Sequence, residues 1–211
     1  VYFFIEHLKV HHKWVGTDKD HATAKYGESL YQFFIRSVKG QTIGAFNMET
    51  TRLKALNKPA ISFANFVVVQ IALQIIVAIL ILFIAGPLFL LAWLIQCLVA
   101  NFLLEYVNYI QHYGLMRNEK QRVTEEYSWE SNQFVSRFVL VDLSRHADHH
   151  YYASKPYHTL VGYEASPKLP SGYAGLFFIA AVPFLWKKVM HGRIRKLKQS
   201  GLTAYEIELR E

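Results

Sequence analysis

The sequence predicts an all-α integral-membrane protein, in which a transmembrane hairpin is flanked by histidine-bearing helices on the cytoplasmic side. Three observations favour this fold class: a long uncharged apolar run, basic residues confined to its two flanks, and clustered histidines. Of the 211 residues 52% are hydrophobic and 18% are charged, whereas an ordinary soluble domain has about 25% charged residues. This composition excludes a disordered chain, and the single cysteine, Cys97, excludes a disulfide scaffold. We expect residues 1–211 to form one membrane-bound domain.

The segment from Pro59 to Leu104 contains no Asp, Glu, Lys or Arg over 46 residues. A transmembrane helix needs roughly 20 apolar residues to cross the hydrocarbon core, so this run is long enough for two. The pair Gly86-Pro87 divides the run, because glycine favours turns and proline cannot donate a helical N–H. The sequence therefore predicts transmembrane helices over about residues 63–84 and 88–110, joined by a very short turn.

The basic residues indicate the orientation of this hairpin. The turn carries none of the 23 Lys and Arg residues; nine precede the apolar run and fourteen follow it. The positive-inside rule places both flanks in the cytoplasm, where they can also contact anionic lipid head groups. The net charge of +7 is thus explained by topology, and we expect no nucleic-acid partner.

Histidines are the most unusual feature of the flanks. Seven of the ten lie in three clusters, namely His7, His11 and His12, then His112, then His146, His149 and His150. The other three stand alone and are not expected to bind metal: His21, His158 and His191. At about 3.6 residues per turn, the members of the third cluster share one helix face. His7 and His11 are likewise stacked, with His12 rotated by about a quarter turn.

Such clusters favour a metal site, because neutral imidazole is the commonest biological metal ligand and suits iron, copper and zinc. A ligating histidine usually donates its other ring N–H to a carboxylate or carbonyl. We expect four side chains to surround the ligands in this way: Glu6, Glu105, Asn108 and Asp148. One zinc ion takes three or four protein ligands, so seven histidines favour two metal ions.

The two ends of the chain carry further signals. An apolar stub, Val1 to Ile5, runs directly into the first cluster without a Met or a signal-peptide layout, which predicts a fragment of a longer chain. Near the other end, residues 173–186 are apolar but too few for a comfortable span. We expect an interfacial or hairpin-packed helix there, ending at Lys187-Lys188, and a polar peripheral tail over residues 193–211.

The histidine clusters carry a family resemblance. The motifs are Glu6-His7-x-x-x-His11-His12, Arg145-His146-x-Asp148-His149-His150 and Asn108-Tyr109-Ile110-Gln111-His112-Tyr113-Gly114-Leu115. The first two resemble the second and third histidine boxes of the integral-membrane alkane monooxygenases, within the fatty-acid desaturase and hydroxylase superfamily. The third motif, the most specific, resembles the additional histidine motif that separates alkane hydroxylases from most desaturases. Smaller matches extend the resemblance over about residues 6–186.

Three departures from the family pattern stand out. The first histidine box is absent and is expected upstream of Val1. Gln111 stands where the family often has glutamate, and Tyr127 stands where relatives commonly have histidine. A charged role at position 111 is therefore not expected here, and the change at position 127 affects the pocket mouth or partner docking.

The resemblance implies a di-iron centre whose ligands in this chain are His7, His11, His12, His112, His146, His149 and His150, with two more from the missing box. It implies an alkane 1-monooxygenase that inserts one atom of O2 into the terminal C–H bond of a medium-chain alkane. Phe89, Trp93 and Phe102 are candidates to line the alkane tunnel. The implied location is the bacterial inner membrane, with the active site on the cytoplasmic side.

The resemblance also implies an external electron donor, since the chain has no dinucleotide-binding motif and no cysteine cluster. The expected donor is a rubredoxin, fed by a reductase that uses NAD(P)H. Rubredoxins are generally acidic, so a basic cytoplasmic face is expected to steer the donor toward the enzyme. That face comprises Arg117, Lys120, Arg122, Lys187, Lys188, Arg193, Arg195, Lys196 and Lys198.

Alternative functions stay open at this point. A xylene-type side-chain hydroxylase or a fatty-acid desaturase or hydroxylase would keep the chemistry and change the substrate, although the motif around His112 argues against a desaturase. A membrane metal transporter would place ligands inside the spans, which only Glu105 approaches. A zinc peptidase would require a His-Glu-x-x-His motif, and this sequence contains none.

Overall fold

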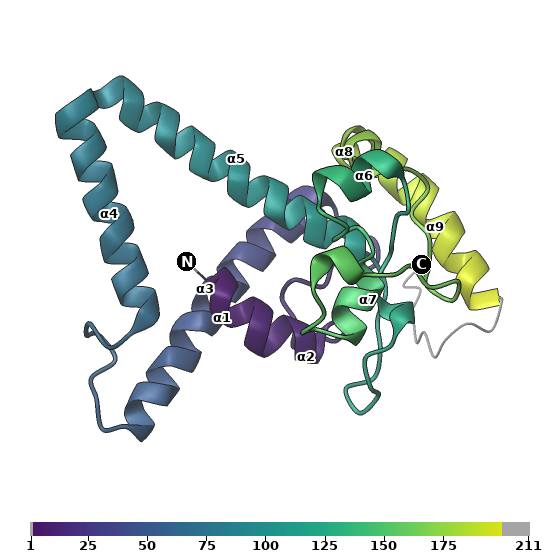
Figure 1. Ribbon diagram of the computed structural model, residues 1–211, viewed down its shortest axis with the longest axis horizontal. Coiled ribbons are helices and arrows are strands. Elements are labelled where there is room, and N and C mark those ends of the chain that lie inside the picture. The colour runs from purple at the N-terminus through teal and green to yellow at the C-terminus, as the bar shows by residue number, and fades with distance from the viewer. Residues whose placement is uncertain (1, 200–211) are drawn as a thin grey trace.

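The computed structural model describes residues 2–199 and confirms the all-α fold class (Figure 1). Within this range the chain forms no β-strand, and an isolated parallel bridge joins Glu130 to Lys168. The α-helices are α1 (Phe3–Glu6), α2 (His12–Trp14), α3 (Leu30–Ala55), α4 (Phe66–Ala85), α5 (Pro87–His112), α6 (Phe134–Val139), α7 (His146–Tyr151), α8 (Tyr173–Ala180) and α9 (Pro183–Gln199). A π-helix, η1 (His7–His11), joins α1 to α2, and 3₁₀ turns occur at η2 (Glu125–Tyr127) and η3 (Tyr157–Thr159).

Helices α4 and α5 form the hairpin that the sequence predicts, and both are long and apolar enough to cross a membrane. Helix α4 begins after Asn65, because the Asn65 side chain accepts hydrogen bonds from the N–H groups of Val67 and Val68. The turn is a single residue, Gly86, whose φ of 93° lies in the left-handed region that favours glycine. Pro87 then starts α5, where its missing N–H costs no helical hydrogen bond.

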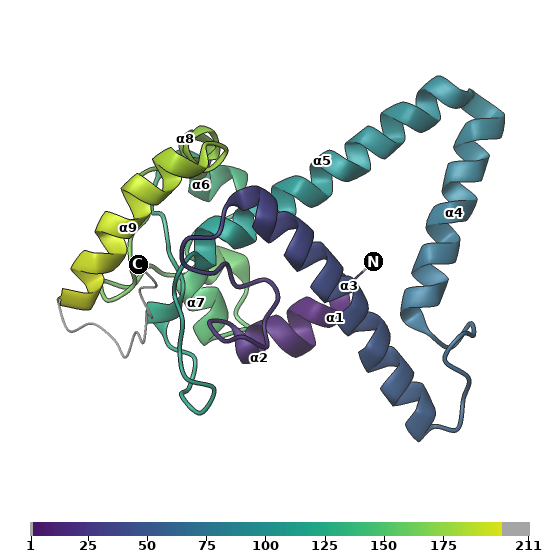
Figure 2. The ribbon, with the colours of Figure 1, turned by 180° about the vertical axis from the view of Figure 1, so that it is seen from behind.

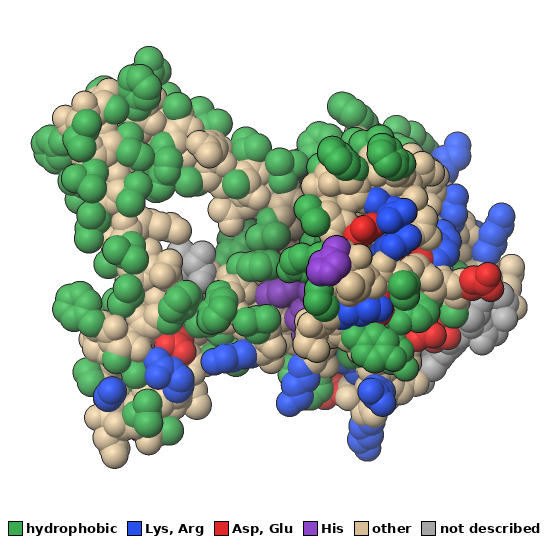
Figure 3. All heavy atoms as spheres, viewed as in Figure 1, with side chains coloured by type: hydrophobic (Ala, Val, Ile, Leu, Met, Phe, Trp, Pro, Cys, Tyr) green, Lys and Arg blue, Asp and Glu red, His purple; other side chains and the backbone are tan. Residues whose placement is uncertain are grey.

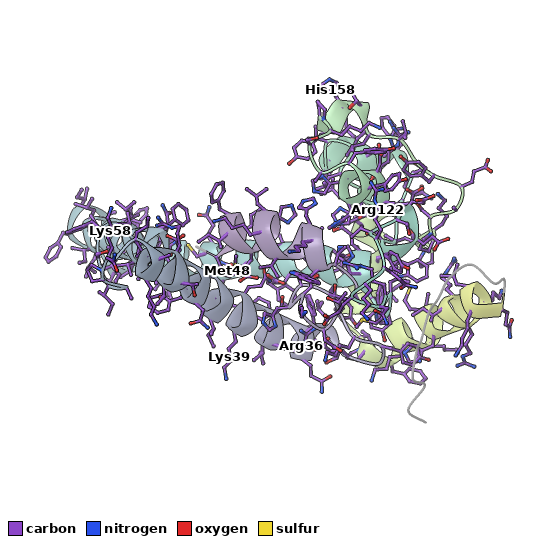
Figure 4. The ribbon with its side chains drawn as sticks, turned by 90° about the horizontal axis from the view of Figure 1, so that it is seen from below. Arg36, Lys39, Met48, Lys58, Arg122 and His158 are labelled. Atoms are coloured by element: carbon purple, nitrogen blue, oxygen red, sulfur yellow. The ribbon has the colours of Figure 1, made fainter. Side chains whose placement is uncertain are left out.

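Helix α3 lies alongside α1 and crosses the C-terminal half of α5 (Figures 1 and 2). Its first turn is closed by a capping box, in which Ser29 and Gln32 exchange side-chain and backbone hydrogen bonds. The face toward the other helices carries polar residues as well as apolar ones, among them Ser37, Gln41 and Glu49. The opposite face is solvated, and Lys39 points away from α1 (Figure 4). Helix α3 therefore presents a buried polar stripe to α1 and α5.

The main hydrophobic core surrounds the C-terminal end of α5. Its largest fully buried side chains include Tyr109 of α5, Tyr113 directly after it, Trp129 of the following loop and Trp186 of α9. The indole N–H of Trp129 donates to the Tyr113 carbonyl at 2.9 Å, so the loop is attached directly to the end of the helix. His112 lies between Tyr109 and Tyr113 in sequence, so this close packing holds it in a rigid environment.

The C-terminal helices differ from the expected single helix ending at Lys187-Lys188. The chain breaks after α8 and turns by 118° before Pro183, and α9 continues through both lysines to Gln199. Lysine is a good helix former, and buried Trp186, Met190 and Ile194 recur every four residues, so one face of α9 packs on the core. The start of the predicted peripheral tail is thus part of a packed helix, and residues 200–211 lie outside the described part of the chain.

Candidate metal centre

The structure brings the seven clustered histidines together in two adjacent groups. One group is fully buried and comprises His11, His112, His146 and His150; the other comprises His7, His12 and His149. In each group the candidate ligand nitrogens all lie within 4.8 Å of one another, a spacing that can hold a metal ion. Few histidine side chains reach the surface on the face shown in Figure 3. Their convergence is confirmed as geometry, while their role as iron ligands stays a prediction.

Nitrogen–nitrogen distances define both groups. In the buried group, the Nε2 atom of His146 lies 3.0 Å from Nε2 of His112 and 2.9 Å from Nε2 of His150. In the other group, Nε2 of His7 lies 3.1 Å from Nε2 of His12 and 3.4 Å from Nε2 of His149. The groups adjoin each other, since the ring centroids of His12 and His150 are 4.8 Å apart. Each group could hold a metal ion, and the two groups lie side by side.

A π-helical segment distributes the first histidine cluster between the groups. An α-helix would stack His7 on His11, as the sequence analysis expected, but residues His7–His11 form the π-helix η1. The wider π turn brings His7 next to His12, five residues on, and leaves His11 to join the buried group. Single π turns occur frequently at functional sites, where they change the direction of a side chain. His7 and His11 remain neighbours, with ring centroids 5.4 Å apart, but they join different groups.

Five of the seven histidines are kept neutral by their surroundings. Burial, followed by the charges of the neighbouring histidines, lowers the pKa of His7 to about 2 and that of His12 to about 3. Burial also lowers the pKa of His149 to about 4, and the pKa values of His146 and His150 lie well below the usual value. A neutral imidazole has a free lone pair for a metal ion. The donor set therefore fits a metal such as iron.

An unsatisfied nitrogen supports the same conclusion. The Nε2 atom of His11 is buried and has no hydrogen-bond partner among the described residues. Its Nδ1 atom is bound to Asp20 Oδ2 at 2.8 Å, which directs the orphaned Nε2 toward the other imidazoles. Buried polar atoms are normally paired, so this nitrogen is suited to a bound ion.

Asp20 is the partner that the sequence analysis missed. Its carboxylate is buried and also accepts hydrogen bonds from the Thr23 hydroxyl at 2.6 Å and the Ala22 N–H at 3.0 Å. Burial raises its pKa, but His11 and the hydrogen bonds outweigh that effect and keep the pKa below the usual value. Asp20 lies in the loop after α2, where no helical spacing relates it to the histidines. Its position in sequence therefore carried no signal.

The outer partners that the sequence analysis expected lie elsewhere. Glu105 accepts hydrogen bonds from Tyr2 at 2.9 Å, Ser37 at 2.7 Å and Gln41 at 3.0 Å, and more weakly from Asn108 at 3.5 Å. Glu105 and Asn108 thus belong to a polar network between α1, α3 and α5. Among the described residues neither forms a hydrogen bond with a histidine, because Glu105 precedes the end of α5 by two turns, about 10 Å.

The expectation for Asp148 needs correction, whereas the role of Glu6 stays a prediction. Asp148 is bound by the Lys155 ammonium at 2.6 Å, the Val161 N–H at 2.8 Å and the Tyr163 hydroxyl at 2.8 Å, on the side of α7 away from the histidines. Residues two apart on a helix point to nearly opposite sides, so Asp148 cannot share the face of its histidine neighbours. Glu6 is buried, and burial followed by the charge of Asp20 raises its pKa to about 7. One Glu6 oxygen has no hydrogen-bond partner in the described part of the chain.

The three solitary histidines lie outside both groups. His21 packs its ring against α3, where a Cβ added at Gly40 would lie 2.5 Å from it. His191 contacts the Tyr113 hydroxyl at 3.0 Å and stacks on another aromatic ring. His158 is exposed at the edge of the molecule (Figure 4). Each has a structural environment that accounts for it without a metal.

The residues of the expected basic face differ in exposure. Arg117 is buried and donates to the backbone carbonyls of Lys13, Val15 and Gln121, so it joins two loops and is not free to meet a partner. Arg122 is exposed and lines a surface hollow of about 320 Å³ that reaches His12 and His150. The expected docking role of Arg117 was wrong, because its guanidinium is satisfied by carbonyls.

The aromatic tunnel residues and the two family departures have defined surroundings. Phe102 packs against Phe34 and Phe177, whereas Phe89 is exposed near the hairpin turn. Gln111 donates to the Tyr173 hydroxyl at 2.8 Å, a contact that needs no charge. The Tyr127 carbonyl lies 3.3 Å from Nδ1 of His112 and fixes that ring through the backbone.

Comparison with known proteins adds the family context. The family model described as fatty acid desaturase matches residues 2–191. Alkane 1-monooxygenase 2 of Pseudomonas aeruginosa is 37% identical over 92% of this chain and 52% of its own length. Alkane 1-monooxygenase of Ectopseudomonas oleovorans is 37% identical over 98% of this chain and 53% of its own. The xylene/toluene monooxygenase hydroxylase component XylM of Pseudomonas putida is 25% identical over 97% and 56%. The chain spans about half the length of these curated relatives.

Proposed function

This chain belongs to the fatty acid desaturase family, and from that membership we propose that it provides seven ligands of a di-iron centre in an alkane 1-monooxygenase. The observation that carries the proposal is the pair of adjacent histidine groups, which together contain every clustered histidine. His11, His112, His146 and His150 would hold one iron ion, and His7, His12 and His149 the other. Bound iron supplies the activation of O2, by which one oxygen atom enters a C–H bond and the other leaves as water, using two electrons.

The protein's own residues prepare this centre. Burial keeps the imidazoles of His146 and His150 neutral, so no proton has to leave these two rings before a metal ion binds. Asp20 orients the His11 ring and the Tyr127 carbonyl orients the His112 ring. Such outer contacts fix the tautomer and raise the basicity of the ligand. The core around Tyr109 and Trp186 then holds the end of α5 in place.

A medium-chain alkane is the substrate that we propose, with attack at its terminal carbon. Alkanes partition into bilayers, so an enzyme with two apolar membrane helices meets its substrate where the substrate is concentrated. Each CH2 group buried in an apolar tunnel contributes about 0.8 kcal/mol, and no polar recognition is required. The alkane monooxygenases match this chain at 34% to 37% identity and the xylene enzyme at 25%, which favours an alkane over an alkyl-aromatic substrate.

Rubredoxin, reduced by an NAD(P)H-dependent reductase, is the proposed electron donor. The hollow that reaches His12 and His150 is lined by Lys13, Trp14 and Arg122, and it brings the surface into contact with both histidine groups. An acidic donor would be attracted to these cations, and electron transfer would then cross a short distance. We further propose that the enzyme resides in the bacterial inner membrane, that residues 1–211 form one domain, and that the centre faces the cytoplasm.

The test is turnover by the full-length protein supplied with rubredoxin, reductase, NAD(P)H and ¹⁸O2. We expect octane to give ¹⁸O-labelled 1-octanol, detected by gas chromatography and mass spectrometry, and m-xylene to react much more slowly. His112→Ala should abolish the product and lower the iron content, whereas the matched His191→Ala should retain both. Full turnover by His112→Ala would contradict the centre, and preferred oxidation of m-xylene would contradict the substrate.

A further inference from the structure

Helix α6 and the turn between α8 and α9 expose an unusual apolar surface. Phe134 and Phe138 of α6 are 78% and 76% exposed, and Phe178 and Phe184 beside the turn are 74% and 72% exposed. Hydrophobic side chains gather over α6 and α8 at the top of Figure 3. A contiguous patch of large apolar groups marks a binding surface, because water does not favour its exposure.

The position of this patch along α5 identifies its partner. Helices α6 and α8 adjoin α5 at Leu103, Tyr106 and Val107, which all line one cavity with them. These residues follow Pro87 by 16 to 20 positions, or about 24 to 30 Å of helix. The hydrocarbon core is roughly 30 Å thick, so the patch lies where α5 leaves it. It is therefore continuous with the membrane-facing surface of the hairpin.

The cavity between α5, α6 and α8 has a volume of about 450 Å³. Its lining is mainly apolar and includes Leu103, Val107, Val135, Val139, Phe177 and Phe178. The polar side chains in the lining are already engaged. The Tyr106 hydroxyl donates to the Tyr173 carbonyl, the Ser136 hydroxyl accepts from the Tyr173 N–H, and the Tyr173 hydroxyl accepts from Gln111. The cavity thus suits a hydrocarbon chain.

Cationic residues lie beside the same surface. Arg137 lies on α6 between Phe134 and Phe138 in sequence and is partly exposed. Its guanidinium forms an ion pair with Asp142, which offsets part of its charge. Lys187 and Lys188 begin one turn after Phe184 on α9, and Lys188 is exposed. Apolar side chains bordered by lysine and arginine are typical of elements that lie in the membrane interface, where the cations meet anionic phosphates.

We propose that α6 and the α8–α9 turn form a third, interfacial membrane contact, in addition to the two spans. The four phenylalanines insert among the acyl chains of the leaflet from which α5 emerges. One phospholipid acyl chain occupies the cavity between α5, α6 and α8, and its head group lies toward the basic residues. This contact supports the histidine-bearing region against the bilayer surface.

Nitroxide accessibility tests the insertion. In full-length protein with Cys97→Ser, spin labels are placed by Phe138→Cys and Phe184→Cys, and the protein is reconstituted in phosphatidylethanolamine–phosphatidylglycerol nanodiscs. Leu94→Cys in α5 is the membrane control and Lys120→Cys is the aqueous control. We expect the ratio of O2 to nickel-chelate accessibility at 138 and 184 to exceed that at 120 at least fivefold. A ratio equal to that at 120, or exclusion of both probes by covering protein, would overturn the proposal.

Photo-crosslinking tests the occupant of the cavity. A phosphatidylglycerol with a diazirine in its acyl chain should label peptides of α6 and α8, and Ala174→Phe, which fills the cavity, should reduce that labelling at least threefold. Ala181→Phe, the same change outside the cavity lining, should not. Labelling by a diazirine alkane but not by the lipid would overturn the lipid assignment. Neither experiment uses iron or turnover, so its failure is distinguishable from failure of the proposed hydroxylase.

Discussion

The substitution Asp20→Asn tests whether the carboxylate bound to His11 supports the metal centre. Asp20 Oδ2 is shared between the His11 ring at 2.8 Å and the Thr23 hydroxyl at 2.6 Å. Asparagine is nearly isosteric, but its single oxygen cannot carry the negative charge. If that oxygen faces His11, its NH2 group meets the Ala22 N–H, which now bonds to Asp20 Oδ1 at 3.0 Å. The Ala22 N–H is then left without an acceptor.

The magnitude follows from the change in hydrogen-bond type. A hydrogen bond to a charged group contributes about 1.5–3 kcal/mol and a neutral one about 0.5–1.5 kcal/mol. The loss of about 1 to 2 kcal/mol corresponds to a roughly 5- to 30-fold weaker iron affinity, since each 1.4 kcal/mol is about tenfold. Losses of about 10- to 100-fold are typical when the carboxylate behind a ligating histidine is replaced.

The assay is iron affinity of the full-length protein, measured by competition with a chelator and by iron content after dialysis. The matched control is Asp18→Asn in the same loop, because Asp18 is exposed and its contact is with the exposed Lys25. We expect Asp18→Asn to keep the affinity of the unmodified protein. Unchanged affinity in Asp20→Asn, or an equal loss in both variants, would refute the reasoning from the His11 contact.

Five further substitutions probe the surroundings of the centre. Glu105→Gln should lower the free energy of unfolding by about 1–3 kcal/mol, because its single remaining oxygen can serve Tyr2 and Gln41 while the buried Ser37 hydroxyl loses its acceptor. Tyr2→Phe should cost about 1 kcal/mol, and both losses can be measured by chemical denaturation in detergent. A larger loss in Tyr2→Phe than in Glu105→Gln would contradict the shared network. Arg117→Lys should lower the melting temperature, since an ammonium cannot reach three carbonyls in different directions, whereas exposed Arg122→Lys should not. His191→Ala should leave the iron content unchanged by elemental analysis, and loss of one iron equivalent would show that the histidine groups omit a ligand.

Local signals were sufficient for much of the helical framework. The hairpin could be predicted because an uncharged run of 46 residues and the Gly86-Pro87 pair depend only on neighbours in sequence. The shared face of His146, His149 and His150 follows from α-helical spacing, and α7 has that geometry. In the α8–α9 region the prediction from local sequence was wrong. Lys187 and Lys188 were expected to end a helix, but Trp186 and Met190 pack on the core and the helix continues past both lysines.

Composition and spacing were enough to predict which residues can span a membrane and which histidines share a helix. The division of the histidines into two groups could not be predicted, because it depends on a π turn that places His7 beside His12 and on the packing of His11 near α5. It also assigned Asp20 to His11 and Glu105 to a network between three helices. The two kinds of contact differ in how far apart their partners lie in sequence. Helical spacing is set by bonds within one turn, whereas the partner of a buried polar group is set by whichever distant segment packs beside it.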